Sequence, residues 1–177
     1  YVAIDPMTER PATVPFPVMK KDLYRIDLLK TKEFLEEHKP ELIILGKSMV
    51  LYKEPLREIA EMIAPMNPKP ILLYDMAHVL GLIGPYFQEP FKEGADIVTG
   101  STHKTFFGPQ RGVISSNMSE GMEYEELWEA IVRRVFPGSV SNHHLGTMVG
   151  LLLAAYEMNA FKLDYQKAVI ANAKAFA

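Results

Sequence analysis

The sequence has no cysteine, no excess of basic residues and no long hydrophobic run. The absence of cysteine excludes a disulfide framework, a zinc–thiolate site and a thiol nucleophile, and it fits a reducing, cytoplasmic compartment. Lysine and arginine together number 19 and aspartate and glutamate 22, and the net charge of −3 argues against a nucleic-acid partner. The most apolar run, residues 145–155, contains two glycines and is too short to cross a bilayer, so we expect no membrane partner.

The remaining composition is that of a globular domain. The chain has 177 residues, of which 48% are hydrophobic and 23% charged, so it forms one domain or a large piece of one. It starts without Met in a strand-like segment, residues 1–4, and ends inside a helix-like stretch, residues 168–177, with no stop signal. We therefore expect a fragment of a longer protein, catalytically inactive on its own.

Short apolar runs predict four strands. They lie at residues 42–45, 71–74, 96–99 and 113–114. The run at residues 42–45 has no alternation, which indicates burial on both faces. Because helical patterns alternate with the strands, the fold class is α/β, with a mainly parallel sheet and covering helices. The connection between the third and fourth runs is short and contains Gly108 and Pro109, so these two strands are expected to be antiparallel.

Start and stop signals place the helices. Asp27 is a candidate N-cap for a first helix, and Pro40 ends it. Pro55 fits the first position of a second helix. The apolar stripe of that helix is formed by Leu56, Ile59 and Ile63. A long Ala/Leu-rich stretch at residues 144–177 predicts a final helical segment.

Three of the predicted strands are followed by polar or ionisable residues. These groups are residues 46–48, 75–78 and 101–105. Ligands of open α/β sheets bind beyond the carboxyl ends of the strands, so the convergence of three such groups predicts a ligand site. The first group, Gly-Lys-Ser, is not a phosphate-binding P-loop, because Glu41 stands where that loop needs a glycine.

Asp75 and Lys104 carry the most informative chemistry at this edge. A carboxylate that ends an apolar run is costly without a partner, although a role as a turn residue stays open. A lysine beside a crevice can be desolvated and its amine made nucleophilic, although lysines near strand edges are commonly solvated. Together they match pyridoxal phosphate, which needs a Schiff-base lysine and an acid at its ring nitrogen. No metal site is predicted, because His143 and His144 are adjacent and lack the spacing of a helical zinc pair.

Five segments agree in order and residue type with one enzyme family. They are residues 39–48, 73–82, 95–109, 136–138 and 172–175. The most specific motifs are Leu-Tyr-Asp-Met-Ala-His at residues 73–78 and Thr-His-Lys-Thr at residues 102–105. On these motifs the chain resembles the serine hydroxymethyltransferases, which are pyridoxal-phosphate enzymes of fold type I.

The resemblance implies a role for each candidate residue. Lys104 would form the Schiff base with pyridoxal phosphate, Asp75 would pair with the pyridine nitrogen, and Ala77 would pack against one face of the ring. Further contacts to the cofactor or the substrate would come from His78, Ser48, Ser101, His103 and Gly138. The implied catalytic set is Lys104, His78, His103 and Thr102.

The resemblance also implies a fold and an assembly. Residues 1–177 would be a single domain, part of the large domain of the aspartate-aminotransferase-like type, without its N-terminal segment and the C-terminal small domain. The protein would be a homodimer with its sites at the interface, and the Phe-Pro-Gly loop would approach the partner's cofactor phosphate. Two segments depart from the family, because residues 139–142 lack its paired glycines and Gln110 displaces its arginine to Arg111. We therefore expect a divergent member with altered phosphate contacts.

The function implied by the resemblance is hydroxymethyltransferase or aldolase-type chemistry at Cα of an amino acid, interconverting serine and glycine. Tetrahydrofolate is a candidate co-substrate, which would place the protein in one-carbon metabolism. Two alternatives stay open. One is another pyridoxal-phosphate enzyme of the same fold, such as an aldolase, lyase, desulfurase or aminotransferase, and the other is a non-catalytic α/β binding domain.

Overall fold

The computed structural model describes residues 4–9, 12–118, 124–142 and 144–177. The expected strand at the start of the chain and His143 therefore lie wholly or mostly outside the described residues. The chain divides into two compact units, residues 1–40 and 41–177, which are described separately.

The first unit holds a short hairpin and one helix. Strands β1 (Val18–Met19) and β2 (Asp22–Ile26) pair antiparallel, and α1 spans Leu28–His38. Asp27 is the N-cap, as predicted, and its Oδ1 accepts a hydrogen bond from the Lys30 amide at 3.3 Å. The last helical residue is His38, two positions before the predicted stop at Pro40, and the C-cap Lys39 adopts the left-handed conformation with φ of 43°. The hairpin was not predicted, because its strands are mostly exposed and contain no continuous apolar run as long as those at residues 42–45 and 71–74.

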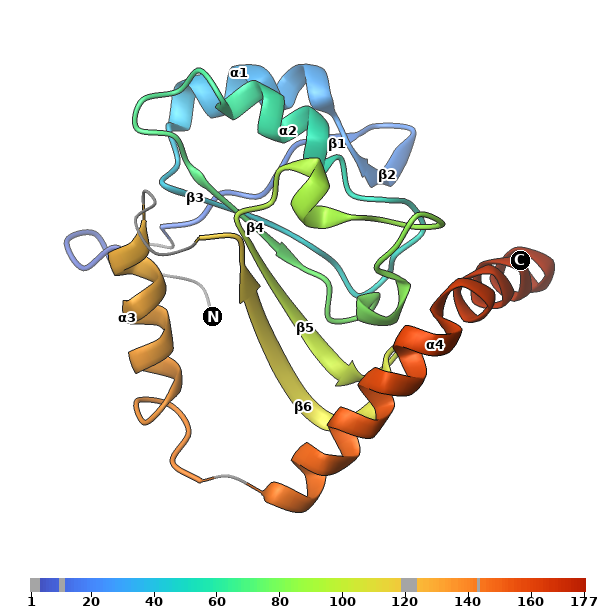
Figure 1. Cartoon of the computed structure of the whole chain (residues 1–177). Coiled ribbons are helices and arrows are strands. Elements are labelled where there is room, and N and C mark those ends of the chain that lie inside the picture. Colours follow the sequence, from blue (N-terminus) through green and yellow to red (C-terminus); the bar gives the residue numbers. More distant parts are fainter. Residues whose placement is uncertain (1–3, 10–11, 119–123, 143) are drawn as a thin grey trace. The chain divides into compact units, whose positions relative to one another are not determined.

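The second unit is built on a four-stranded sheet in the order β3-β4-β5-β6 (Figure 1). The strands are Leu42–Leu45, Ile71–Asp75, Ile97–His103 and Phe107–Ser116. β3, β4 and β5 are parallel to one another, and β5 and β6 are antiparallel. The mixed, mainly parallel sheet and the antiparallel last pair are thus confirmed. β5 and β6 are longer than the apolar runs that predicted them, because their polar ends pair with each other in a hairpin.

Helix α2 (Leu56–Ile63) buries the predicted stripe completely, since Leu56, Ile59 and Ile63 are all 0% exposed. Pro55 is the N-cap and not the first helical residue, a shift of one position. The expectation that residues 42–45 are buried on both faces is wrong. Ile43 and Leu45 are buried, whereas Leu42 and Ile44 are about half exposed, because β3 is an edge strand with one face open.

Helix α3 (Glu125–Val135) packs against the sheet near the start of β4 and β5. Trp128 and Ile131 lie on a small core of Ile71, Ile97 and Met118. Asp96 ties the same region together, since its carboxylate accepts hydrogen bonds from the Leu72 amide at 2.8 Å and from Lys69 Nζ at 3.0 Å.

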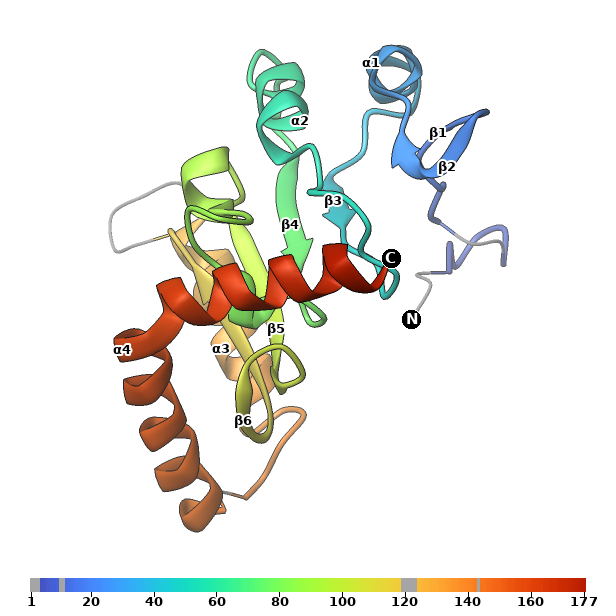
Figure 2. The same ribbon diagram turned by 90° about the vertical axis from the view of Figure 1, so that its right-hand side faces the viewer.

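The long helical segment at the end of the chain is one continuous helix, α4 (Leu145–Phe176), which changes direction along its length (Figure 2). Its buried residues are Ala154, Met158 and Gln166. They lie where α4 runs over β6 and the short 3₁₀ turn η1 (Leu80–Leu82). No helix in the described part of the chain is both long and apolar enough to span a membrane.

Candidate active site

The ends of β3 and β4 lie directly against each other. Gly46 follows β3 with φ of +135°, and a Cβ at this position would collide with the carbonyl group of Asp75. Only glycine fits this close approach, which brings the loop with Lys47 and Ser48 to the end of β4. Ser48 is exposed in this loop. Lys47 Nζ lies 3.0 Å from Oε1 of the buried Glu54 and so ties the loop back to the protein.

Asp75 ends β4 and starts a turn. Its Oδ1 accepts a hydrogen bond from the Ala77 amide at 3.0 Å, so the role as a turn residue that the sequence left open is present in the structure. The carboxylate is nevertheless exposed, and no other hydrogen-bond or ion-pair partner is found among the described residues. One bond orients the group while the rest of it stays available to a ligand.

Lys104 lies in the turn between β5 and β6, beside the turn that follows β4. Lys104 Nζ is 3.3 Å from His78 Nε2. The hydroxyl of Thr105 donates to the His78 carbonyl at 3.0 Å and accepts from the Gly81 amide at 3.1 Å. The structure therefore brings Lys104 and His78 together, although 26 residues separate them in the chain.

Gly81 is the contact point between these two turns. A Cβ on Gly81 would overlap the carbonyl oxygen and carbon of Thr105, which are backbone atoms and cannot swing aside as a flexible side chain could. Gly81→Ala is therefore expected to destabilise the fold by about 1–3 kcal/mol, because relief requires moving the turn that carries Lys104. Denaturant unfolding of the full-length protein measures this loss.

The matched control is Gly146→Ala in α4, where nothing lies within 4 Å of the added Cβ. That variant is expected to lose no stability and can gain up to about 1 kcal/mol from better helix propensity. A loss at Gly81 no larger than the change at Gly146 would contradict the close contact between the two turns.

The remaining candidates on β5 are Ser101, Thr102 and His103, whose side chains lie on two faces of the strand. Thr102 is 1% exposed, and its hydroxyl lies 2.6 Å from the Pro109 carbonyl oxygen and 3.0 Å from that of Arg111. Its hydroxyl therefore connects β5 to β6 and holds the hairpin together. Ser101 is half-buried and His103 exposed, and strand alternation places both on the face opposite Thr102.

Gly138 lies in the loop between α3 and α4. A Cβ there would lie 2.5 Å from the Arg134 carbonyl oxygen, so the tight turn that ends the helix needs a glycine. The three atoms nearest to this Cβ all belong to Arg134, and none of them belongs to Lys104. Arg111 is drawn toward α4, where its guanidinium donates to the Thr147 hydroxyl.

The sequence reasoning missed two contacts from α4. The Tyr165 hydroxyl donates to the Thr105 carbonyl at 2.5 Å, and partial burial raises the pKa of this phenol. Gln166 donates to the backbone of the turn after His78. No local pattern signals either contact, because each joins residues at least 60 positions apart.

A buried phenol precedes the carboxylate of Asp75 in the chain. Tyr74 precedes Asp75 and is 1% exposed. Burial, followed by the negative charges of Glu54, Glu93 and Asp75, raises the pKa of this phenol well above its usual range. The phenol therefore stays protonated at neutral pH.

Among the described residues no group of three or more potential metal ligands comes together.

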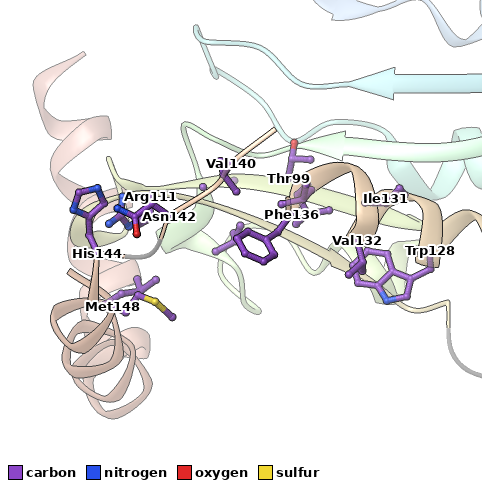
Figure 3. Close-up of a pocket in the computed structure, with 16 residues that line it drawn as sticks. Thr99, Arg111, Trp128, Ile131, Val132, Phe136, Val140, Asn142, His144 and Met148 are labelled. Carbon is purple, nitrogen blue, oxygen red and sulfur yellow. The ribbon is translucent and has the colours of Figure 1, made fainter. Parts of the chain in front are cut away.

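A large groove of about 880 Å³ lies between α3, the start of α4 and the face of β5 and β6 (Figure 3). Figure 3 shows Arg111, Asn142 and His144 at one end, and the lining is otherwise mainly apolar. None of the candidate site residues lines it. We place the candidate site at the strand ends, where Lys104 Nζ meets His78 and where Asp75, three residues before His78, ends β4.

The arrangement at the strand ends offers three complementary groups. An amine can condense with a carbonyl compound, an adjacent imidazole can exchange a proton with that amine, and a carboxylate can hold a protonated ring nitrogen. Asp75 is the last residue of β4, His78 lies in the turn that follows it, and Lys104 lies in the turn after the neighbouring strand β5.

Comparison with known proteins gives consistent results. Residues 7–177 match the sequence model of the family described as "Serine hydroxymethyltransferase". The chain is 50% identical over 153 residues to the serine hydroxymethyltransferase of Archaeoglobus fulgidus and 47% identical over 153 residues to that of Korarchaeum cryptofilum. Each of these alignments covers 86% of this chain but 33% of the relative, so the chain spans about a third of the length of these curated relatives.

A solved structure supports the same fold. The crystal structure of L-threonine transaldolase from Pseudomonas fluorescens in its internal aldimine state matches with a TM-score of 0.78 and 35% sequence identity. The match covers 90% of this chain and 35% of that chain.

Proposed function

The chain belongs to the serine hydroxymethyltransferase family, and from this premise we propose that it carries the central site of a pyridoxal-phosphate enzyme acting at Cα of an amino acid. The observation that carries the proposal is the 3.3 Å approach of Lys104 Nζ to His78 Nε2, with the exposed carboxylate of Asp75 three residues before His78 in the chain. Serine and glycine are the proposed substrate and product, with tetrahydrofolate as the proposed co-substrate.

The residues at the strand ends fit this cofactor. Lys104 offers an exposed amine, and Asp75 has carboxylate capacity left after its single bond to Ala77. When bound, pyridoxal phosphate supplies an aldehyde that condenses with an amine and a ring that stabilises negative charge at Cα. Asp75 would hold the proton at the ring nitrogen, and the Ala77 amide keeps that carboxylate oriented.

The protein's own groups would then manage binding and protons. Lys104 would bind the cofactor and, once released by the incoming amino acid, would hold or return a proton at Cα. His78 is placed to exchange a hydrogen bond with the Lys104 amine. Ser48, Ser101 and His103 are proposed to contact the cofactor or the substrate, with His103 and Thr102 supporting the reaction from β5.

The assembly is part of the proposal. We propose that residues 1–177 form part of a large domain of the aspartate-aminotransferase-like type, in a cytoplasmic homodimer. The loop that carries Gly138, between α3 and α4, is proposed to lie at the partner's site. The departures at residues 139–142 and Gln110 would then alter the contacts to the cofactor phosphate.

The test is serine turnover by the full-length protein, measured with and without tetrahydrofolate after loading with pyridoxal phosphate. We expect a visible absorbance band of the bound cofactor and release of glycine from serine that is faster with folate. A protein that shows no such band would contradict the proposed cofactor. A band without any cleavage of serine would contradict the proposed reaction.

The second candidate function is an aldolase or transaldolase reaction on a related hydroxy amino acid. The structural match to L-threonine transaldolase at 35% identity favours it over the other enzymes of this fold. Threonine assayed in parallel with serine separates the two, since the first proposal expects serine to be the better substrate.

A further inference from the structure

Helix α4 reaches back to the candidate site through two consecutive residues. The Tyr165 hydroxyl donates to the carbonyl oxygen of Thr105, the residue after Lys104, at 2.5 Å. Gln166 Nε2 donates to the Ile83 carbonyl at 2.6 Å and to the Gly81 carbonyl at 3.3 Å. One segment of one helix therefore contacts both turns of the site.

The side-chain amide of Gln166 is held in place by the two hydrogen bonds that its Nε2 group donates. The residue is 1% exposed, and its Oε1 has no hydrogen-bond partner among the described residues. An unpaired buried acceptor costs free energy, so the two bonds from Nε2 are what keep this side chain in place. The Tyr165 ring is held by a different contact, since it packs edge-on against Phe107 with 5.3 Å between the ring centroids.

The two turns are also hydrogen-bonded to each other, so the two turns and helix α4 form a closed ring of contacts. The hydroxyl of Thr105 donates to the His78 carbonyl and accepts from the Gly81 amide. Tyr165 holds Thr105 from the other side, and Gln166 holds the carbonyl of Gly81. The distance between the Lys104 amine and the His78 imidazole is set inside this ring.

We propose that Tyr165 and Gln166 are positioning residues, which fix the turn of Lys104 against the turn of His78 and so set the contact between amine and imidazole. The inference rests on the proposed function of Lys104 as the cofactor-binding lysine. Neither residue reaches the amine or the imidazole itself, so both act through Thr105, Gly81 and Ile83.

The principal test is Tyr165→Phe in the full-length, cofactor-loaded protein. This variant keeps the ring that packs on Phe107 and removes one hydrogen bond. We expect kcat for serine to fall about fivefold to tenfold, with KM changed less than about twofold, because the loss affects the placement of Lys104 and not the binding of substrate. The pH midpoint of the absorbance change of the bound cofactor is expected to shift, since the His78 imidazole no longer faces the Lys104 side-chain nitrogen at the same distance.

Two further measurements separate positioning from general stability. Tyr156→Phe makes the same change on an exposed face of α4, where the side chain is 68% exposed, and is expected to keep the wild-type kcat, KM and pH midpoint. Hydrogen exchange of the segment 76–83 is expected to be faster in Tyr165→Phe than in Tyr156→Phe. If Tyr165→Phe does not fold, Gln166→Met removes the two Nε2 donors at similar size and is expected to show the same shifts.

The outcomes distinguish this inference from the proposed function. A wild-type protein without a cofactor absorbance band refutes the proposed function and this inference with it. A wild-type band together with a folded Tyr165→Phe that matches Tyr156→Phe in kcat, pH midpoint and hydrogen exchange overturns the positioning role alone.

Discussion

Replacing Lys104 with arginine is expected to lower serine turnover by the full-length protein at least about a thousandfold. Arginine keeps the positive charge and much of the length of lysine, but its guanidinium does not deprotonate near neutral pH and cannot act as an amine nucleophile. The exposed turn between β5 and β6 can accommodate the larger side chain, so the fold is expected to survive. The measurement is kcat, with the absorbance band of the bound cofactor as a second readout.

The control for this prediction is Lys92→Arg. Lys92 is also an exposed lysine, with 74% of its side chain accessible, and it pairs with Glu89 at 2.7 Å on the surface. Because arginine can make the same surface ion pair, turnover is expected to stay at the wild-type value. A Lys104→Arg protein that retains more than about a tenth of the wild-type turnover would show that another residue holds the cofactor.

Replacing Asp75 with asparagine is expected to lower turnover about a hundredfold or more while leaving the fold intact. The side-chain oxygen of asparagine can still accept the bond from the Ala77 amide, so the turn is kept. What is lost is the negative charge that would keep the ring nitrogen of the cofactor protonated, and with it the capacity of the ring to accept electrons. The measurements are kcat and the midpoint of thermal unfolding.

Asp96→Asn is the matched control, because it makes the same chemical change in a carboxylate that supports the sheet. Asp96 bonds Lys69 Nζ and the Leu72 amide, so its replacement is expected to cost about 1–3 kcal/mol of stability and to leave turnover of the folded protein near the wild-type value. The two variants should therefore show opposite patterns. If Asp75→Asn kept near wild-type turnover, the charge of Asp75 would have no role in the reaction, and Asp75 would serve only to form its turn.

The part of the site that could be predicted from the sequence is the part carried by strand ends. The polar groups at residues 75–78 and 101–105 each follow a predicted strand, and the parallel order of β4 and β5 brings the carboxyl ends of these strands to one edge. The contact between Lys104 and His78 follows from that topology. The sequence identified Gly81 only as part of a motif. The structure shows why a glycine is needed there, since a side chain would overlap the backbone of Thr105.

Other features depend on packing between distant segments, which local patterns do not encode. The open face of β3 could not be predicted, since Leu42 and Ile44 have the same apolar character as the buried Ile43 and Leu45. The orientation of Thr102 into the hairpin was also missed.

Tyr165 and Gln166 lie in a long helix whose sequence gives no sign that one turn of it meets the site. Their hydrogen bonds are to backbone carbonyl groups, which every residue offers, so no pairing of residue types marks the contact in the sequence.

The central claim is that Lys104 holds the cofactor, and chemical labelling tests it most directly. Borohydride reduction of the full-length protein loaded with pyridoxal phosphate fixes the cofactor to the lysine that binds it, and peptide mapping identifies that lysine. The expected result is a single label on Lys104. A label on Lys47, the lysine of the neighbouring strand end, would contradict the assignment of the site.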